Sequence, residues 1–323
     1  MNLNKKTAFK ISLYNILRYS ITIICIVMLI YKIATIDDWN TIANLFTNMS
    51  SQRLSLLAAA VLLLALNVLC EAYKWQIALY RLAKISFSLS FKSVLWGYTG
   101  AFITPNSLGE YPTRSLHLSN DCRARSVLLG FFSSAIQTAV ISICGVIGLI
   151  FWLDCHYFYI SQWILFGMPM LFVILIVAFL VRFRGIIAFF TKIGLHSLAK
   201  YTDILLLISR RQIIALIVVS ILKFSVFSVQ FLLILSFCGL NISWSNAMID
   251  ITVFYLFMTY IPLMNLFEVA VRSSVAIIVF GSYTETNTPI VFGSIIFWLL
   301  NFCMPTVIGL FVGCNPYKIV NKA

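Results

Sequence analysis

The sequence predicts an all-α integral membrane protein with about six transmembrane helices and two re-entrant helical hairpins in an inverted repeat. First, 61% of the 323 residues are hydrophobic and only 10% are charged, whereas a soluble domain carries about 25% charged residues. Second, apolar stretches recur near the length of about 20 residues that a helix needs to cross a bilayer. Third, two of these stretches are interrupted by the same polar motif.

The uninterrupted apolar stretches predict the transmembrane helices, at residues 16–36, 54–73, 126–153, 161–181, 212–239 and 290–314. The interrupted stretches, 93–118 and 247–281, predict the hairpins. Residues 182–211 mix apolar side chains with spaced Arg and Lys, which is typical of an in-plane helix on the cytoplasmic face. Residues 74–92 have a similar pattern.

We therefore expect one membrane domain over residues 1–323, without a separate soluble domain. Its parts are a first helix and outer segment (1–53), a first repeat (54–181), the interfacial helix (182–211) and a second repeat (212–315).

The positions of Lys and Arg predict the orientation. If the interrupted stretches are hairpins, 18 of the 23 Lys and Arg residues lie on one side of the membrane, and Lys32 and Arg53 lie on the other. Arg114, Lys223 and Arg272 then lie at membrane depth. Basic loops face the cytoplasm, so we expect a multi-pass protein of the plasma (inner) membrane with both termini cytoplasmic. The net charge of +13 is therefore a topology signal and does not indicate nucleic-acid binding.

The two interrupted stretches share a motif in which a capping residue is followed by Glu at +3 and Arg at +7. Its residues are Ser107, Glu110 and Arg114 in the first copy, and Asn265, Glu268 and Arg272 in the second.

Each part of this motif has a physical reason. A preceding proline breaks the incoming helix, and the Ser-x-x-Glu or Asn-x-x-Glu spacing matches a helix N-cap. Glu-x-x-x-Arg places opposite charges one turn apart on a helix. A charge at mid-membrane costs about 2.5–3.5 kcal/mol on insertion scales. Broken backbone at that depth is tolerated where it is buried in protein or lines a wet cavity.

Several segments resemble the transmembrane region of lysylphosphatidylglycerol synthases, a flippase-like family. They are Gly97–Glu110 with Arg114 and Leu116, the run Glu71–Trp75, and the Pro262, Glu268 and Arg272 segment. The similarity covers about residues 54–315, although Met264 and Phe267 depart from the glycine-rich form of the motif. The resemblance implies movement of aminoacylated or other lipids between leaflets. Synthase activity is not expected, because the chain ends at Ala323 without an aminoacyltransferase domain.

The leading interpretation is therefore translocation of an anionic or aminoacylated phospholipid, or of a polyprenyl-linked lipid. Arg114 and Arg272 would bind a headgroup phosphate. Glu110 and Glu268 would orient these arginines or contact a cationic headgroup. Lys223, about 18 Å into its span by helix rise, would add a positive contact or a counter-ion for a Glu. The competing interpretation is that each Glu–Arg pair only locks its hairpin. Amides that would line the path or join helices are Asn67, Gln137, Gln230 and Asn301.

Two other functions stay open. Asp37 and Asp38, in an outer loop, would suit a membrane-embedded transferase with a lipid-linked donor. A non-catalytic membrane partner of a separate lipid-modifying enzyme is the other alternative. An enzyme is the less favoured class, and we expect no catalytic residue, cofactor or metal site, because the Cys and His residues are scattered. The expected partner is membrane phospholipid. A homo-oligomer stays open.

Overall fold

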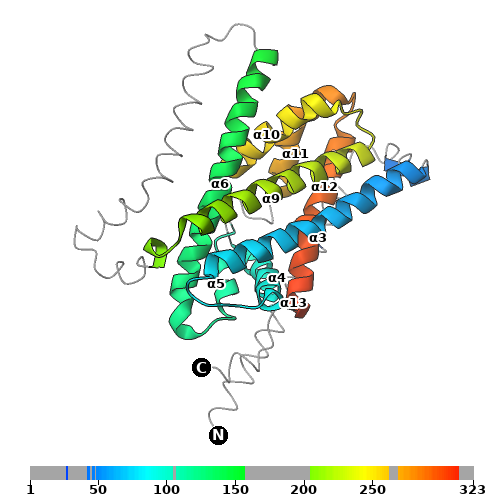
Figure 1. Ribbon diagram of the computed structural model, residues 1–323. Coiled ribbons are helices and arrows are strands. Elements are labelled where there is room, and N and C mark those ends of the chain that lie inside the picture. The colour runs from blue at the N-terminus through cyan, green and yellow to red at the C-terminus, as the bar shows by residue number, and fades with distance from the viewer. Residues whose placement is uncertain are drawn as a thin grey trace.

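The computed structural model describes residues 49–104, 107–156, 204–261 and 268–312, with isolated positions 27, 42–43 and 46–47. Every regular element in these ranges is helical (Figure 1). The predicted span 161–181, residues 182–203 of the predicted interfacial helix, and all of the predicted span 16–36 except position 27 lie outside the described residues.

Four helical segments in the described ranges are long and apolar enough to cross a membrane. Three of them are α3 (Ser51–Leu79), α6 (Asn120–His156) and α9 (Arg210–Phe237). The fourth is continuous through α12 (Thr288–Trp298), a π-helical turn (Leu299–Cys303) and α13 (Met304–Val312). These segments coincide with four of the six predicted spans, which confirms the multi-pass helical class.

Both interrupted stretches form a pair of helices with a break between them. In the first, α4 (Phe87–Ile103) precedes the short helix α5 (Glu110–Ser115). In the second, α10 (Trp244–Tyr260) precedes α11 (Glu268–Phe280), which continues into a 3-10 turn at Gly281–Tyr283. The predicted breaks are therefore present, and each second helix begins at the Glu of its motif.

The first break is stabilised by one threonine side chain. The Thr104 hydroxyl donates to the Gly100 carbonyl (2.9 Å) and accepts from the Gly109 amide (2.7 Å). Ser107 adopts a positive φ of 56°. The N-cap of α5 is Gly109, without a side-chain cap. The prediction that Ser107 caps this helix is therefore wrong, because the chain turns at Ser107 and the Glu110 side chain binds Arg114 instead.

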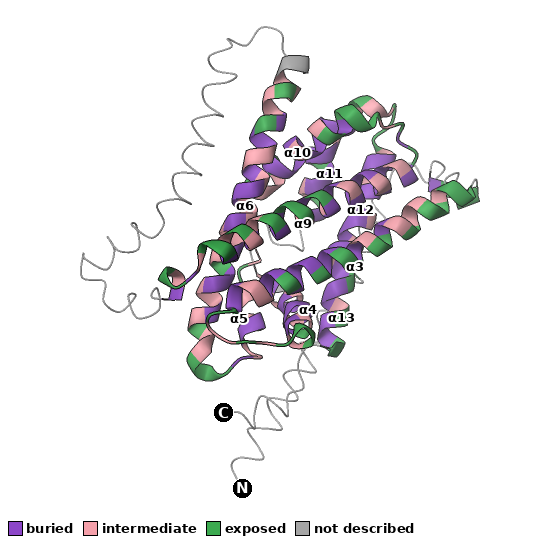
Figure 2. Ribbon diagram, in the orientation of Figure 1, coloured by how far each residue is buried: buried purple, intermediate pink, exposed green. Residues whose placement is uncertain are grey.

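The helices pack in pairs that are distant in sequence. Helix α3 runs along α9, α6 packs on α10, and α13 packs on α4 (Figure 1). Buried residues concentrate where these helices face one another, whereas exposed residues follow the outer sides of α3 and α9 (Figure 2). Leu62 is 71% exposed and Ile214 is 61% exposed. Large apolar side chains on such outer faces suit a lipid solvent.

The predicted in-plane helix at 74–92 is not a separate element. Helix α3 continues to Leu79, and α4 begins at Phe87 after a turn. The reason is that Lys74 and Trp75 are buried, at 3% and 1% exposure. Lys74 pairs with Glu71 inside the bundle, so it does not reach for headgroups. Arg210 and Arg211, the end of the predicted interfacial segment, form the first turn of α9.

We expect Gly309→Ala to lower the melting temperature of the purified protein. A Cβ at Gly309 would overlap the backbone carbonyl of Leu95, where α13 crosses α4. Overpacking of this kind costs about 1–3 kcal/mol. Gly281→Ala is the matched control, because a Cβ there meets nothing within 4 Å. Equal melting temperatures for the two variants would contradict the close α4–α13 contact.

Candidate functional site

A single buried carboxylate on α3, that of Glu71, binds three cations. Its Oε1 accepts from Arg114 Nη1 at 2.9 Å, and its Oε2 lies 2.5 Å from Lys223 Nζ and 3.3 Å from Lys74 Nζ. Arg114 also binds Glu110. We refer to Glu71, Lys74, Glu110, Arg114 and Lys223 as the Glu71 cluster. It joins α3, α5 and α9 through charge-assisted contacts.

Local structure explains how these side chains meet. Lys74 follows Glu71 by three residues and Arg114 follows Glu110 by four, so each pair shares a helix face. Lys223 comes from α9, which packs along α3. Isolated charges in an apolar interior are costly, and mutual pairing offsets that cost. The cluster therefore fixes the relative positions of three helices.

Arg114 is enclosed on several sides and is 1% exposed. Its guanidinium lies 5.5 Å from the Trp75 ring centroid and 5.7 Å from that of Tyr111, at distances typical of cation–π contacts. On α4, a Cβ at Gly97 would lie 2.8 Å from Arg114 Nε. Gly97 thus provides the space that Arg114 occupies.

The second motif forms its own buried pair. Arg272 Nη2 binds the Glu268 carboxylate, as the Glu-x-x-x-Arg spacing predicts. Arg272 is 2% exposed, and its guanidinium lies 4.7 Å from the Phe297 ring centroid, with Phe254 and Phe302 also near. Its Nε and Nη1 make no well-aligned hydrogen bond with the described residues, although the Tyr255 hydroxyl interacts with the guanidinium.

A cavity of about 220 Å³ connects the two charged groups. Lys223 of the Glu71 cluster and the Glu268–Arg272 pair both line it, together with aromatic and polar side chains. Its other lining residues are Gln137, Ile141, Phe224, Phe227, Tyr255, Met258 and Thr259.

Gln137 on α6 lies between the cavity and the Glu71 cluster. Its Oε1 accepts from Lys74 Nζ at 3.1 Å, and its Nε2 donates to the Ser220 carbonyl at 3.3 Å. Gln230 and Asn301 instead donate to the backbone carbonyls of Ala60 and Phe297. Of these amides, Gln137 is thus the one that lines this cavity.

The structure brings together Glu110, Arg114 and Lys223, and it places Glu268 and Arg272 at the same cavity as Lys223. Lys223 is a counter-ion for a Glu, as one of its two predicted roles required, and that Glu is Glu71. Ser107 lies in the turn before α5, and Asn265 lies outside the described residues. Glu71 and Lys74 were not among the predicted site residues. Their i, i+3 spacing within an apolar span could have identified them as a buried ion pair.

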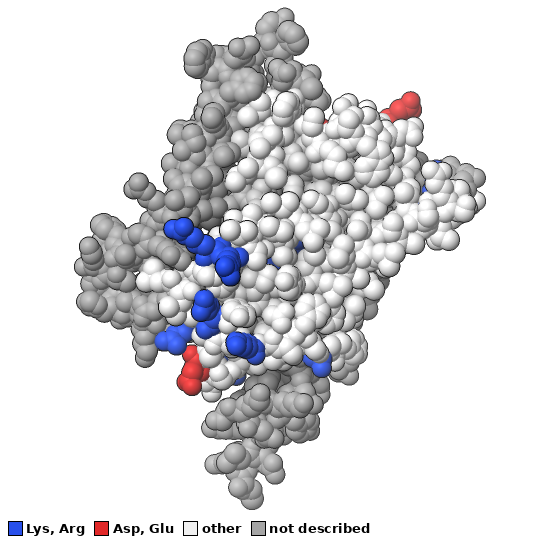
Figure 3. Space-filling model, in the orientation of Figure 1, with Lys and Arg blue, Asp and Glu red and all other residues white. Residues whose placement is uncertain are grey.

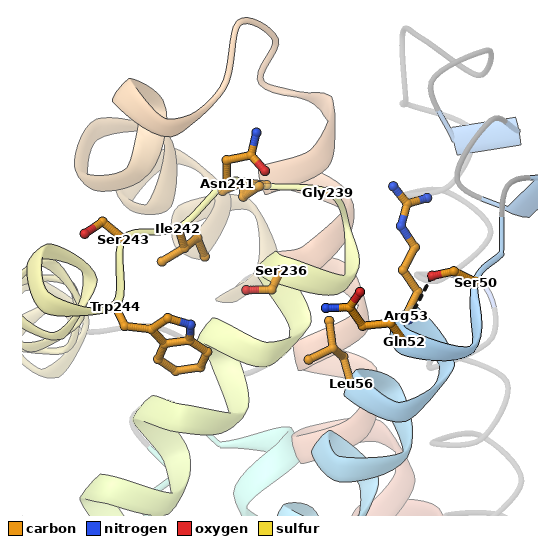
Figure 4. Close-up of a pocket in the computed structure, with 11 residues that line it drawn as sticks. Ser50, Gln52, Arg53, Leu56, Ser236, Gly239, Asn241, Ile242, Ser243 and Trp244 are labelled. Carbon is orange, nitrogen blue, oxygen red and sulfur yellow. Dashed lines mark hydrogen bonds between the residues drawn. The ribbon is translucent and has the colours of Figure 1, made fainter.

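A second and larger hollow, of about 760 Å³, lies between the start of α3 and the α9–α10 loop. Figure 4 shows Arg53 and Gln52 on its α3 side, and Asn241 and Ser243 on its loop side. The Ser50 hydroxyl accepts from the Arg53 amide at 3.2 Å, which caps α3. This hollow contains none of the predicted site residues.

We expect Glu71→Gln to lower the melting temperature of the purified protein by several degrees. Removing one partner of a buried ion pair costs about 3–5 kcal/mol, because the remaining charges stay buried. Glu285→Gln, at an exposed position, is the control and is expected to melt like the wild type. A Glu71→Gln protein as stable as this control would show that the cluster does not hold the helices.

Comparison with known proteins places the chain in a family. No curated protein matches it. A family model described as the lysylphosphatidylglycerol synthase TM region matches residues 15–309, which is most of the chain. This match includes both Glu–Arg motifs, the Glu71 cluster and the cavity. The chain therefore belongs to the lysylphosphatidylglycerol synthase TM region family and is a membrane protein of lipid metabolism or translocation.

Proposed function

We propose that the protein translocates a phosphate-bearing lipid, anionic or aminoacylated, between the leaflets of the plasma (inner) membrane. The observation that carries this proposal is the cavity lined by Lys223, Glu268 and Arg272. Buried ionisable residues in membrane-spanning proteins mark substrate paths because they are expensive to retain. A cavity with cationic groups and aromatic walls suits a headgroup that must leave water.

The arrangement of the broken helices supports the same function. We propose that α4–α5 and α10–α11 are re-entrant hairpins that enter from opposite faces as an inverted repeat. Both second helices begin at a buried or partly buried Glu and carry Arg one turn later. Broken helices that meet near the bilayer midplane surround the substrate in many transporters. The proposed path contains Glu110, Arg114, Glu268, Arg272 and Lys223, with Ser107 and Asn265 at the two breaks.

The surface charge supports an orientation with both termini in the cytoplasm. In Figure 3, most visible Lys and Arg side chains gather at the lower left of the molecule, around the starts of α6 and α9, with one acidic side chain beside them and another at the opposite end. The first two turns of these helices contain Arg123, Arg125, Arg210 and Arg211. Basic segments of this kind stay on the cytoplasmic side.

We expect reporter fusions to agree with this orientation. Green fluorescent protein fused after Ala323 should fluoresce, and alkaline phosphatase at the same position should be inactive, because that end is proposed to be cytoplasmic. A phosphatase fusion truncated after Glu285 should be active. Active phosphatase after Ala323 would reverse the proposed orientation.

We expect the purified protein in liposomes to exchange a fluorescently labelled phospholipid between leaflets. Arg272→Ala should lower the exchange rate at least about tenfold, the effect expected when a hydrogen bond to a charged group is lost. Arg114→Ala should also lower it, because it leaves the carboxylates of Glu71 and Glu110 without this partner. The readout is the fraction of label that dithionite reduces with time.

Arg53→Ala is the control for loss of a positive charge, because Arg53 lies at the larger hollow and not at the proposed path. It should exchange lipid like the wild type. If wild-type protein exchanges no glycerophospholipid, the proposed function is wrong. If Arg272→Ala exchanges it at the wild-type rate, the lipid does not pass through this cavity.

A further inference from the structure

The two Glu–Arg motifs match in sequence, but their arginines have different surroundings. Arg114 contacts two carboxylates, those of Glu71 and Glu110. Arg272 contacts one, that of Glu268. Arg272 therefore has fewer carboxylate partners than Arg114.

The remaining donors of the two arginines also differ. Arg114 Nε faces Gly97 so closely that a methyl group would not fit between them, and Arg114 does not line the cavity. Arg272 does line the cavity, and its Nε and Nη1 make no well-aligned hydrogen bond within the described ranges. The Tyr255 hydroxyl, which also lines the cavity, donates to the Phe227 carbonyl at 3.2 Å and interacts with Arg272. One hydroxyl cannot satisfy both nitrogens, so at least one buried N–H of Arg272 still requires an acceptor.

Lys223 supplies a second cation to the same cavity. Its Nζ binds Glu71 at 2.5 Å, and its side chain keeps 19% exposure. An ammonium group has three donors, so Lys223 can hold Glu71 and still donate to a ligand. Lys223 and Arg272 thus present donors from α9 and α11 to one partly open cavity.

The charge of the connected groups indicates what the ligand carries. Four positive charges come from Lys74, Arg114, Lys223 and Arg272. Three negative charges come from Glu71, Glu110 and Glu268, so the sum is +1. One monoanion neutralises this sum. A phosphodiester carries one negative charge, whereas a phosphomonoester carries about −1.5 to −2 at pH 7.

The volume of the cavity limits how much of a ligand it can hold. The cavity measures about 220 Å³. Pockets that enclose a whole drug-sized molecule measure about 300–1,000 Å³. The cavity therefore fits a phosphate and its neighbouring atoms, with acyl chains outside it.

We propose that Arg272 and Lys223 bind one phosphodiester monoanion in this cavity, and that Arg114 stays with its two carboxylates and does not contact the ligand. The assignment of this phosphodiester to a lipid headgroup rests on the proposed function. A free phosphodiester has the same chemistry and would bind through the same donors.

The test is calorimetric titration of the purified full-length protein in a non-ionic sugar detergent. The ligands are dioctanoylphosphatidylglycerol, dioctanoylphosphatidic acid, dimethyl phosphate and dioctanoylglycerol. Dioctanoylphosphatidylglycerol should bind one to one and more tightly than the phosphatidic acid, and the neutral diglyceride should not bind. Dimethyl phosphate binding as tightly as the lipid would support the site and identify a soluble source. Weaker binding of dimethyl phosphate would support it and identify the lipid.

Three variants locate the binding. Arg272→Gln and Lys223→Gln should each weaken binding of dioctanoylphosphatidylglycerol about tenfold or more, and Ile141→Trp should abolish it by filling the cavity without changing charge. Arg53→Gln is the matched control and should bind like the wild type. Wild-type affinity in Arg272→Gln or in Ile141→Trp would overturn the proposal.

A fourth variant tests whether the sum of the connected charges sets the preferred ligand charge. Its readout is a change of preference between two ligands and does not require that binding is lost. Glu268→Gln raises the sum of the connected charges from +1 to +2, so the preference should move toward phosphatidic acid. An unchanged preference would overturn the charge argument. Because these titrations need no transport, binding without leaflet exchange would support the site and contradict the proposed function. Unimpaired exchange by Arg272→Gln would contradict the site and leave translocation standing.

Discussion

The structure depends on one buried carboxylate that binds three cations. Glu71 connects α3 to α5 through Arg114 and to α9 through Lys223, and it also holds Lys74 on its own helix. Each cation would be expensive in an apolar bundle without a partner. Because Lys223 is both a partner of Glu71 and a wall of the cavity, the interaction that joins the helices also places a donor at the proposed binding site.

The cavity is lined by both polar and aromatic side chains. Lys223, Gln137 and the Glu268–Arg272 pair supply polar groups, and Phe224 and Phe227 supply aromatic ones. Arg272 is further surrounded by aromatic rings, which attract its charge without accepting its remaining N–H donors. Such surroundings keep the guanidinium buried and still able to bind an anion.

Much of the fold follows from the sequence, because apolar length and basic residues are local signals. Four spans, both helix breaks and both Glu–Arg pairs lie where the sequence predicts them. Other features depend on tertiary contacts that the pattern does not contain. Lys74 resembles an interfacial lysine in sequence, yet Glu71 and Gln137 retain it in the bundle. Ser107 matches a capping residue, yet the turn after Thr104 gives it a positive φ. The different surroundings of Arg114 and Arg272 arise from Glu71 and Gly97, which lie outside the repeated motif.

The central claim is that Lys223 and Arg272 bind a phosphodiester inside the bundle. The most direct measurement is an electron cryo-microscopy structure of the protein in nanodiscs that contain phosphatidylglycerol. The account predicts phosphate density in the cavity, within hydrogen-bond distance of Lys223 Nζ and of Arg272 Nε or Nη1, with acyl chains leading to the lipid. Density for protein side chains filling the cavity, with Arg272 donors satisfied by them, would contradict it.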